Sequence, residues 1–406
     1  MKTESQVVKL DYGLYFRTLR EIRGYTLEKV AKSIPMAFSN LSRIETGAIK
    51  INDESIQSLL KFYGIKNIDA TNSNIFEELD ELTNNFLTLE IPIEFKYDGI
   101  INLNDVNLPY NLLIESLQKV LCGRFDSQLD KIIRILDKVV DLFQEKYVQL
   151  YLVFRSYIFI HQKKYLEAQK KLKNLECIEF IDERIQAVYL YYRIALSSVL
   201  NNDHESQQYY DKIKNILKNH HLFYRLTKVN LLEANRFSEL GYFDEAIKIY
   251  EENFENIKEN SVKHTVLFNI ANQYLFKKEY ENALEFYIRS TQYQIDNHVC
   301  FSIAWCYYKL NNTTYAKIYI DKSKEYEVYT EYYVLFLQWL ECMLHKKYSK
   351  KCFEILKKIE KRYIKIMHQG SMIFLYMQLE DYYLYHEMYK EAHHYSRLIN
   401  ESHIKY

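Results

Sequence analysis

The chain has 406 residues and a net charge of zero, with 54 Lys and Arg side chains against 54 Asp and Glu. Its 48% hydrophobic and 27% charged residues are an ordinary globular balance, and no apolar run approaches the ~20 residues of a membrane-spanning helix. Only three Pro and eight Gly are present, which predicts long helices with short connections and hence an all-α fold. The N-terminus lacks a signal-peptide apolar region, so we expect a cytoplasmic protein.

The segment that starts at residue 12 predicts two short helices. Apolar side chains recur at three-residue steps in the first helix, at Phe16, Leu19 and Ile22, and Gly24 ends it. Thr26 is a good N-cap for the second helix. The apolar stripe of the second helix consists of Leu27, Val30, Ala31 and Ile34.

A third helix is the candidate DNA-reading helix. Pro35 prevents the preceding helix from continuing, and a helix starting near Ala37 buries Leu41 and Ile44. Asn suits adenine edges, Arg suits guanine and Phe suits the thymine methyl. We therefore expect the exposed residues of this helix to contact bases: Phe38, Ser39, Asn40, Ser42 and Arg43. Lys32 and Lys50 lie at helix ends and are expected to face the DNA backbone. Gly47 closes the third helix, and a fourth from about Asp53 to Tyr63 packs behind it.

Residues 12 to 65 resemble the helix-turn-helix domain of phage-repressor-like bacterial regulators. The matching positions are Leu27, Ala31, Leu41, Ser42, Ile44, Glu45 and Gly47. The resemblance implies that Arg20 on the first helix pairs with Glu45, although Pro35 stands where the family often has Gly. The alternative is a small helical packing module that makes no contact with DNA.

The distribution of charge favours DNA binding by this segment. Residues 1 to 66 hold eleven Lys and Arg and seven Asp and Glu, a net charge of +4. Residues 67 to 106 hold one Lys and nine Asp and Glu, a net charge of −8. A basic head beside an acidic segment is expected if only the head meets phosphate.

An acidic segment separates the head from the rest of the chain. Ile75, Phe76, Leu79, Leu82 and Phe86 recur at helical spacing, which predicts an amphipathic helix that either packs on the protein or contacts a second copy in a dimer. Residues 91 to 110 lack helical periodicity, and we place a domain boundary there. The predicted division is a helix-turn-helix domain at 1–66, a linker at 67–110 and a repeat domain at 111–406.

From about residue 111 onward the chain repeats itself. Aligning YFDEAIKIYEENF with EYENALEFYIRS places Ala246 over Ala283 and Tyr250 over Tyr287. Steps of 33 to 40 residues extend this register, which predicts about eight helix pairs. The remaining positions in register are Leu129, Ala168, Gln207, Ala316, Cys352 and Ala392. The pattern resembles tetratricopeptide repeats, whose small residues let the two helices of a unit pack closely.

A repressor-like head on such repeats resembles the peptide-pheromone receptors of Gram-positive bacteria, the family that includes Rgg, PlcR, PrgX and NprR and shares its repeats with the Rap proteins. The resemblance implies a right-handed α-solenoid whose concave face binds a short secreted signalling peptide after import. It implies a quorum-sensing transcription regulator. A homodimer is expected, because one small head reads only half of a two-fold double-stranded DNA operator.

Two asparagines are the leading candidates for holding the peptide. Asn235 and Asn272 fall at the same position of neighbouring repeats, on the face predicted to be concave. A side-chain amide there can pair with the N–H and C=O groups of an extended peptide, and the family is known for such Asn clamps. A carboxylate partner and side-chain pockets on the same face are predicted at Lys228, Tyr192, Phe268 and Trp305. The alternative is that these are satisfied polar or packing residues in repeats that bind a protein, or nothing.

Catalysis has little support, because the sequence contains no phosphate-cradling or nucleophile-elbow glycine motif. The six Cys form no C-x-x-C pair and fit buried thiols, and neither a metal nor another cofactor is expected. Two other functions remain open. In the first alternative, the repeats sequester a response regulator or another protein, and DNA binding is secondary. In the second, the repeats serve only to dimerise a regulator that needs no ligand.

Overall fold

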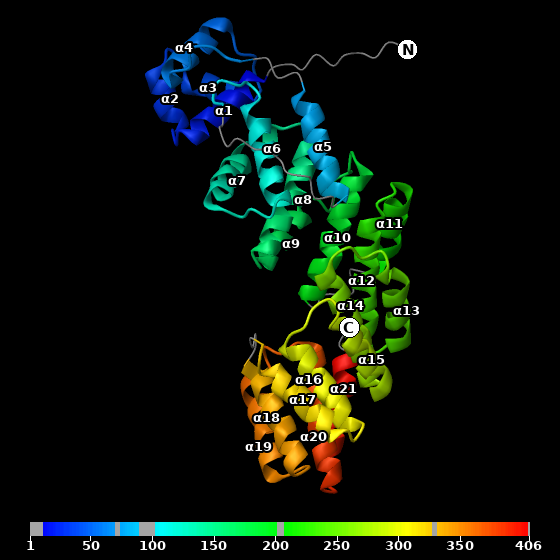
Figure 1. Cartoon of the computed structure of the whole chain (residues 1–406). Helices are drawn as coiled ribbons and strands as arrows, with labels where there is room; N and C mark the ends of the chain where they lie inside the picture. Colours follow the sequence, from blue (N-terminus) through cyan, green and yellow to red (C-terminus); the bar gives the residue numbers. More distant parts are fainter. Residues whose placement is uncertain (1–10, 70–73, 89–101, 201–206, 327–330, 405–406) are drawn as a thin grey trace. The chain divides into compact units, whose positions relative to one another are not determined.

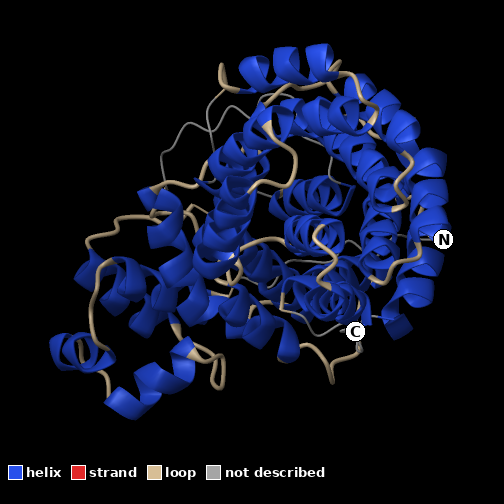
Figure 2. Ribbon diagram, turned by 90° about the horizontal axis from the view of Figure 1, so that it is seen from below, coloured by secondary structure: helices blue, strands red, loops and turns tan. Residues whose placement is uncertain are grey.

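The structure is a computed structural model that describes residues 11–69, 74–88, 102–200, 207–326 and 331–404. In these residues every regular element is a helix (Figure 2), so the predicted all-α fold is confirmed. The helices, labelled in Figure 1, are α1 Tyr12–Ile22, α2 Leu27–Ser33, α3 Phe38–Glu45, α4 Asp53–Tyr63, α5 Ile75–Thr88, α6 Leu108–Leu121, α7 Ser127–Val139, η1 Val140–Leu142, α8 Glu145–His161, α9 Tyr165–Lys173, α10 Glu183–Val199, α11 Gln207–Asn219, α12 Phe223–Glu239, α13 Phe243–Phe254, α14 Asn260–Phe276, α15 Tyr280–Ser290, α16 Asn297–Lys309, α17 Thr313–Ser323, α18 Glu331–His345, α19 Lys350–Tyr363, α20 Gln369–Tyr385 and α21 Tyr389–Ile404. Each of these helices is too short or too polar to cross a lipid bilayer.

The head consists of α1 to α4, with the predicted starts and stops. Thr26 caps α2 by accepting a hydrogen bond from the backbone N–H of Lys29, and Gly24 and Gly47 end α1 and α3 with positive φ angles. Gly13 has a role that the sequence pattern did not reveal. A Cβ atom at this position would lie 2.1 Å from the carbonyl oxygen of Ile44, so α1 can approach α3 only with glycine there.

The acidic segment contains the predicted helix, α5. Ile75, Leu79, Leu82 and Phe86 are buried on one face, and α5 packs against α6 and α10. The packing role is therefore confirmed, while a dimer contact through this helix stays a prediction. Most of the predicted boundary lies outside the described residues, since 89–101 are not described.

Contacts divide the chain into two compact units, residues 1–200 with 211–225, and residues 201–210 with 226–406. In the first unit, α1 packs on α6 and α7 as well as on α3 and α4. Lys138 on α7 forms an ion pair of 2.6 Å with Glu21, and the hydroxyl of Tyr15 donates to the carbonyl of Leu103 at 2.8 Å. The domain boundary predicted between residues 67 and 110 therefore stays a prediction.

From α6 to α21 the helices follow one another in eight consecutive pairs. The residue at the register position lies in the second helix of every pair, and it is small or apolar in all of them except α11, where it is Gln207. The register residues whose burial is described are at most 3% exposed: Leu129, Ala168, Ala246, Ala283, Ala316, Cys352 and Ala392. These buried positions are where the two helices of a pair pack against each other, as the repeat pattern predicts.

Candidate functional site

Helix α3 presents the face that was predicted to read DNA. Leu41 and Ile44 are buried and fix α3 to the core of the head, which turns the opposite side to solvent. Phe38 is 54% exposed on this side. Ser39, Asn40 and Arg43 are exposed as well, and Ser42 is half-buried.

The implied ion pair inside the head is present. The guanidinium of Arg20 donates to both carboxylate oxygens of Glu45 over 2.8 to 3.0 Å, from α1 to the last residue of α3. Burial raises the pKa of the Glu45 carboxyl, and the hydrogen bonds from Arg20 act in the opposite direction. Both side chains are largely removed from solvent, so the pair fixes the orientation of α3 on α1.

The two lysines predicted to face phosphate lie in different surroundings. Lys50 shares a small surface hollow with Asn40, near the start of α3. Lys32 is exposed on α2 and forms an ion pair of 2.6 Å with Glu28, one turn earlier. The structure therefore groups Lys50, and not Lys32, with a predicted base-contacting residue.

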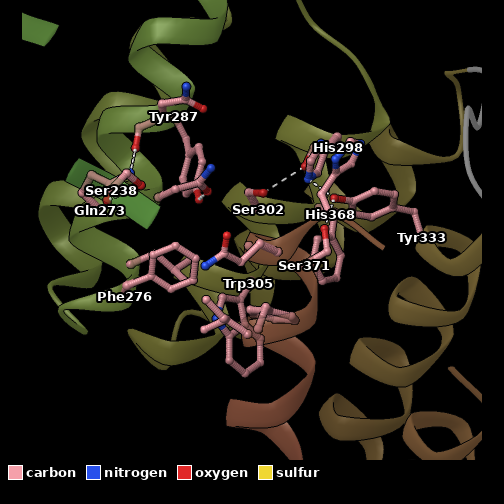
Figure 3. A pocket seen from close by; sticks show the side chains of 18 of the residues that line it. Ser238, Gln273, Phe276, Tyr287, His298, Ser302, Trp305, Tyr333, His368 and Ser371 are labelled. Carbon is pink, nitrogen blue, oxygen red and sulfur yellow. Dashed lines mark hydrogen bonds between the residues drawn. The ribbon is translucent and has the colours of Figure 1, made fainter. Parts of the chain in front are cut away.

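The second unit contains a cavity of about 530 Å³ (Figure 3), which is richer in amides on one side and in aromatic rings on the other. Amide and hydroxyl side chains from α12 to α15 line one half. The other half is formed by α16, α18 and α20 and is rich in aromatic rings. The amide side is lined by Asn235, Ser238, Asn269, Asn272, Gln273, Tyr250 and Tyr287, and the aromatic side by Phe301, Trp305, Tyr332, Tyr333, Phe336 and Phe374.

Asn235 and Asn272 both line this cavity, in equivalent surroundings. The hydroxyl of Tyr250 donates to Oδ1 of Asn235 at 2.5 Å, and the hydroxyl of Tyr287 donates to Oδ1 of Asn272 at 2.5 Å. Burial raises the pKa of both tyrosines, so each hydroxyl keeps its proton. Each pair joins the two helices of one repeat. Because the tyrosine occupies the oxygen, the amide nitrogen is the group best placed to bind a ligand.

The other residues predicted for the peptide face are distributed differently. Trp305 lines the aromatic half of the cavity, whereas Phe268 packs beside it against Tyr287 and His298. The ammonium of Lys228 lies 3.3 Å from the carboxylate of Glu259, and Lys228 is not among the cavity-lining residues. Tyr192 is buried in the first unit.

Several cavity residues were not predicted. His298 forms a hydrogen bond with the hydroxyl of Tyr333, which is also 3.1 Å from Oγ of Ser371. Figure 3 shows this cluster beside Ser302 and His368. Burial lowers the pKa of His298 to about 4, so its imidazole is neutral at neutral pH. No signal in the sequence joins these residues, which come from three helices.

Two further amides lie in the cavity wall. Asn269 is one turn before Asn272 on α14, a spacing from which it could have been found, and its Nδ2 lies 3.3 Å from Oδ1 of Asn235. Asn297 is 3% exposed, and its Nδ2 has no hydrogen-bond partner among the described residues. A buried amide without a partner is costly, so Asn297 offers a donor to a ligand. The described residues contain no group of three His, Cys, Asp or Glu side chains arranged to hold a metal.

Comparison with known families matches residues 11–69 to a helix-turn-helix domain. No curated protein matches the sequence. Many solved structures resemble this chain, and three of them illustrate the shared fold. The aspartyl phosphate phosphatase F of Bacillus subtilis is 17% identical, with 83% of this chain and 96% of that chain covered and a TM-score of 0.53.

A Rap protein complexed with Competence and Sporulation Factor is 14% identical, covers 82% of this chain and 99% of its own, and has a TM-score of 0.55. The apo form of the quorum sensor NprR from B. thuringiensis is 18% identical, covers 81% and 98%, and has a TM-score of 0.56. These likenesses concern the fold. The chain thus combines a helix-turn-helix domain with a helical-repeat fold like that of the Rap protein and of NprR.

Proposed function

We propose that the protein is a cytoplasmic, homodimeric transcription regulator that binds an operator through α3 and is controlled by a short imported peptide. The peptide binds in the cavity of the second unit. The observation that carries this proposal is the pair of equivalent Asn–Tyr contacts in the cavity wall, in a chain that also has a helix-turn-helix head.

The DNA-binding part of the proposal is supported by the chemistry of α3. In helix-turn-helix proteins the second helix of the motif enters the major groove. Here that helix exposes Asn40 and Arg43, whose side chains suit adenine and guanine, and Phe38, which suits the thymine methyl. One head covers only a half-site, and two-fold operators are read by two-fold dimers.

The peptide-binding part is supported by the spacing of donors. Asn235 and Asn272 occupy the thirteenth position of α12 and of α14, two 17-residue helices. Amide donors repeated in this way suit the carbonyl groups of an extended backbone, and they hold a peptide without reading its side chains. The aromatic half provides a site for an apolar side chain, and the cavity volume lies within the usual range for ligand sites.

The charge of the cavity limits the class of peptide. Among the described residues that line it there is no Lys or Arg, whereas Glu239 and Asp296 contribute carboxylates. A buried carboxylate on the ligand would have no cation to neutralise it. The bound part of the peptide is therefore neutral or basic.

Two experiments test the proposal. Selection of binding sites from random double-stranded DNA, followed by a gel-shift assay with the full chain, tests operator binding. Enrichment of a two-fold sequence is expected. If the selected DNA shows no sequence preference, the DNA-binding part is contradicted. If the full chain retains a receiver-domain protein instead, the repeats are better described as a module that sequesters a protein.

Peptide binding is tested with pools of random heptapeptides that carry Asp, Lys or Ala at one fixed position. The readout is the intrinsic tryptophan fluorescence, because Trp305 lines the cavity. Asn235→Ala and Asn272→Ala should each weaken binding by roughly 1–3 kcal/mol, because a buried carbonyl of the peptide loses its donor. Asn256→Ala, an exposed residue outside the cavity, is the control. Equal affinity in both cavity variants and the control would contradict the clamp.

A further inference from the structure

Two thiols lie against each other where α18 and α19 pack together. The Sγ of Cys352 donates to the Sγ of Cys342 at a distance of 3.0 Å. The hydroxyl of Ser349 is 3.4 Å from Sγ of Cys342 and 3.2 Å from Sγ of Cys352. No other pair of thiols in the described part of the chain is in hydrogen-bond contact. Cys122 and Cys177 are exposed, which corrects the expectation of uniformly buried thiols, and Cys300 and Cys306 are buried.

We propose that Cys342 and Cys352 form a reversible intramolecular disulfide on exposure to a peroxide, so that the turn between α18 and α19 is a site of oxidative modification. The proposal rests on the contact between the two sulfur atoms. It does not depend on peptide binding or on DNA binding.

The exposure of the two thiols indicates which of them reacts first with a peroxide. Cys342 is partly exposed and is open to a small oxidant, whereas Cys352 is fully buried. Burial raises the pKa of the Cys352 thiol to about 11, so Cys352 keeps its proton and donates it toward Cys342. Cys342 is therefore the thiol that a peroxide can reach, and its thiolate is the form that attacks the peroxide.

The reaction balances in two steps. The Cys342 thiolate attacks one peroxide oxygen and becomes a sulfenic acid, while the other oxygen leaves as hydroxide and takes up a proton to form water. The Cys352 sulfur then attacks the sulfenic sulfur, the S–S bond forms, and the sulfenic oxygen leaves with the Cys352 proton as a second water. The two thiols lose two electrons, and hydrogen peroxide gains them.

The geometry requires only a small movement. A disulfide needs its sulfur atoms about 2.05 Å apart, roughly 1 Å closer than they are here. The connecting turn ends at Ser349, the N-cap of α19, and contains Tyr348 with a φ of 52°. A turn of this length can follow the two sulfurs without unwinding either helix.

The disulfide would form beside the cavity wall. Tyr333 and Phe336 on α18 line the cavity, and Trp339 lies one turn before Cys342 on the same helix. The ring of Trp339 lies 5.1 Å from that of Trp305, and these are the two Trp residues of the chain. Oxidation is therefore expected to change the intrinsic tryptophan fluorescence, since a disulfide near an indole quenches it.

The test uses the full chain, treated with hydrogen peroxide, alkylated and digested without reduction. Peptide mapping by mass spectrometry should find Cys342 joined to Cys352, with two hydrogen masses lost, and dithiothreitol should reverse the link. In the Cys352→Ser variant, the sulfenic acid formed at Cys342 has no second thiol to react with. Dimedone, which labels sulfenic acids, should therefore label Cys342 in this variant and barely label it in the parent. Cys306→Ser, which changes a buried thiol without a thiol neighbour, should behave as the parent.

Two results would overturn the proposal. One is a parent map in which Cys342 and Cys352 stay reduced while the exposed Cys122 and Cys177 are oxidised. The other is equal dimedone labelling of Cys342 in the parent and in Cys352→Ser. Because the first result needs no variant, the proposal remains testable even if Cys352→Ser does not fold.

Discussion

The head and the cavity of the second unit differ in how their candidate functional residues are assembled. In the head, five base-contacting candidates lie within the eight residues of α3. The cavity is lined by residues from Asn235 to Phe374, carried by seven helices. A site built on one helix depends on that helix forming and docking, whereas a site built on seven depends on every intervening packing contact. Substitutions in the two sites should therefore differ in how much of the molecule they disturb.

The Arg20–Glu45 pair should be the most sensitive point of the head. Arg20→Ala leaves the buried carboxylate of Glu45 without its cation, which should lower the free energy of unfolding by about 3–5 kcal/mol. Urea denaturation followed by circular dichroism measures the change. Arg23→Ala, which removes an exposed charge at the end of the same helix, is the matched control and should have little effect.

The same denaturation curves address the domain boundary. If the head unfolds separately, only one of two transitions shifts, which supports the division at residues 67–110. A single transition that shifts as a whole would mean that α1 to α4 unfold together with α6 and α7, in line with the contacts of Glu21 and Tyr15.

The cavity should be sensitive to acid through His298. Its pKa is about 4 in the folded chain against an ordinary value near 6.5, so the unfolded chain binds the proton first. The contribution of the neutral His298 to the free energy of unfolding is therefore fully present above pH 6.5. It should fall by about 3 kcal/mol as the pH drops to 4. Urea unfolding of the parent and of His298→Gln at pH 7.5, 5.5 and 4.5 measures the difference. Asp296, His264 and His368 lie near this imidazole, and an unchanged pH dependence in the variant would assign the loss to them. The Tyr333 hydroxyl, which is bonded to the imidazole, keeps its proton at all three pH values because burial raises its pKa.

Base readout by α3 is a smaller effect. Asn40→Ala and Arg43→Ala should each cost roughly 1–3 kcal/mol at the selected operator and leave affinity for random DNA almost unchanged. Competition gel shifts with both DNAs separate the two quantities. An equal loss on random DNA would mean that α3 contacts only the backbone.

Loss of a tyrosine hydroxyl that is bonded to a cavity amide should weaken peptide binding less than loss of the amide itself. Tyr287→Phe removes the hydroxyl bonded to Asn272, and peptide binding should weaken by about 1 kcal/mol because the amide is no longer fixed. In Asn272→Ala the same tyrosine change should have no additional effect, since its partner is gone. Additive losses in this double-mutant cycle would show that Tyr287 contacts the peptide itself.

The two lysines should show the weakest effects. Lys50→Ala should reduce the slope of log affinity against log salt by about one and weaken all DNA sequences alike. Lys32→Ala should do less, because Lys32 is already paired with Glu28. A larger change in slope for Lys32 than for Lys50 would reverse the assignment of the phosphate contact.

The sequence predicted the fold well because its signals are local. Caps and stops such as Thr26 and Gly47 act within one turn of a helix, and the small residues of the repeats mark where two helices of a pair meet. The same register placed Asn235 and Asn272 in one cavity, since neighbouring repeats superpose by construction. It could not reveal Gly13, whose role depends on the distance to a carbonyl on another helix.

The contacts that a side chain makes with other repeats were harder to predict. Lys228 and Phe268 fall in the register of the cavity face, but Lys228 pairs with Glu259 and Phe268 packs between other rings. The count of basic residues in the head was also a poor guide to free charge. Arg17 donates to the backbone carbonyl of Lys138, and Arg20 is bound to Glu45. A net charge does not show which cations are already engaged inside the protein.

Gln369 and Glu239 both line the cavity, and a hydrogen bond between them joins two helices that lie far apart in the sequence. Arrays of helical repeats normally gain or lose whole units freely, because each unit touches only its neighbours. Here Gln369, at the start of α20, donates to the backbone carbonyls of Glu239 on α12 and of Ser402 on α21. Duplicating or deleting a helix pair between α12 and α20 would break this junction and change the size of the cavity. A change in the number of helix pairs in this stretch should therefore disturb the cavity as directly as the replacement of a residue that lines it.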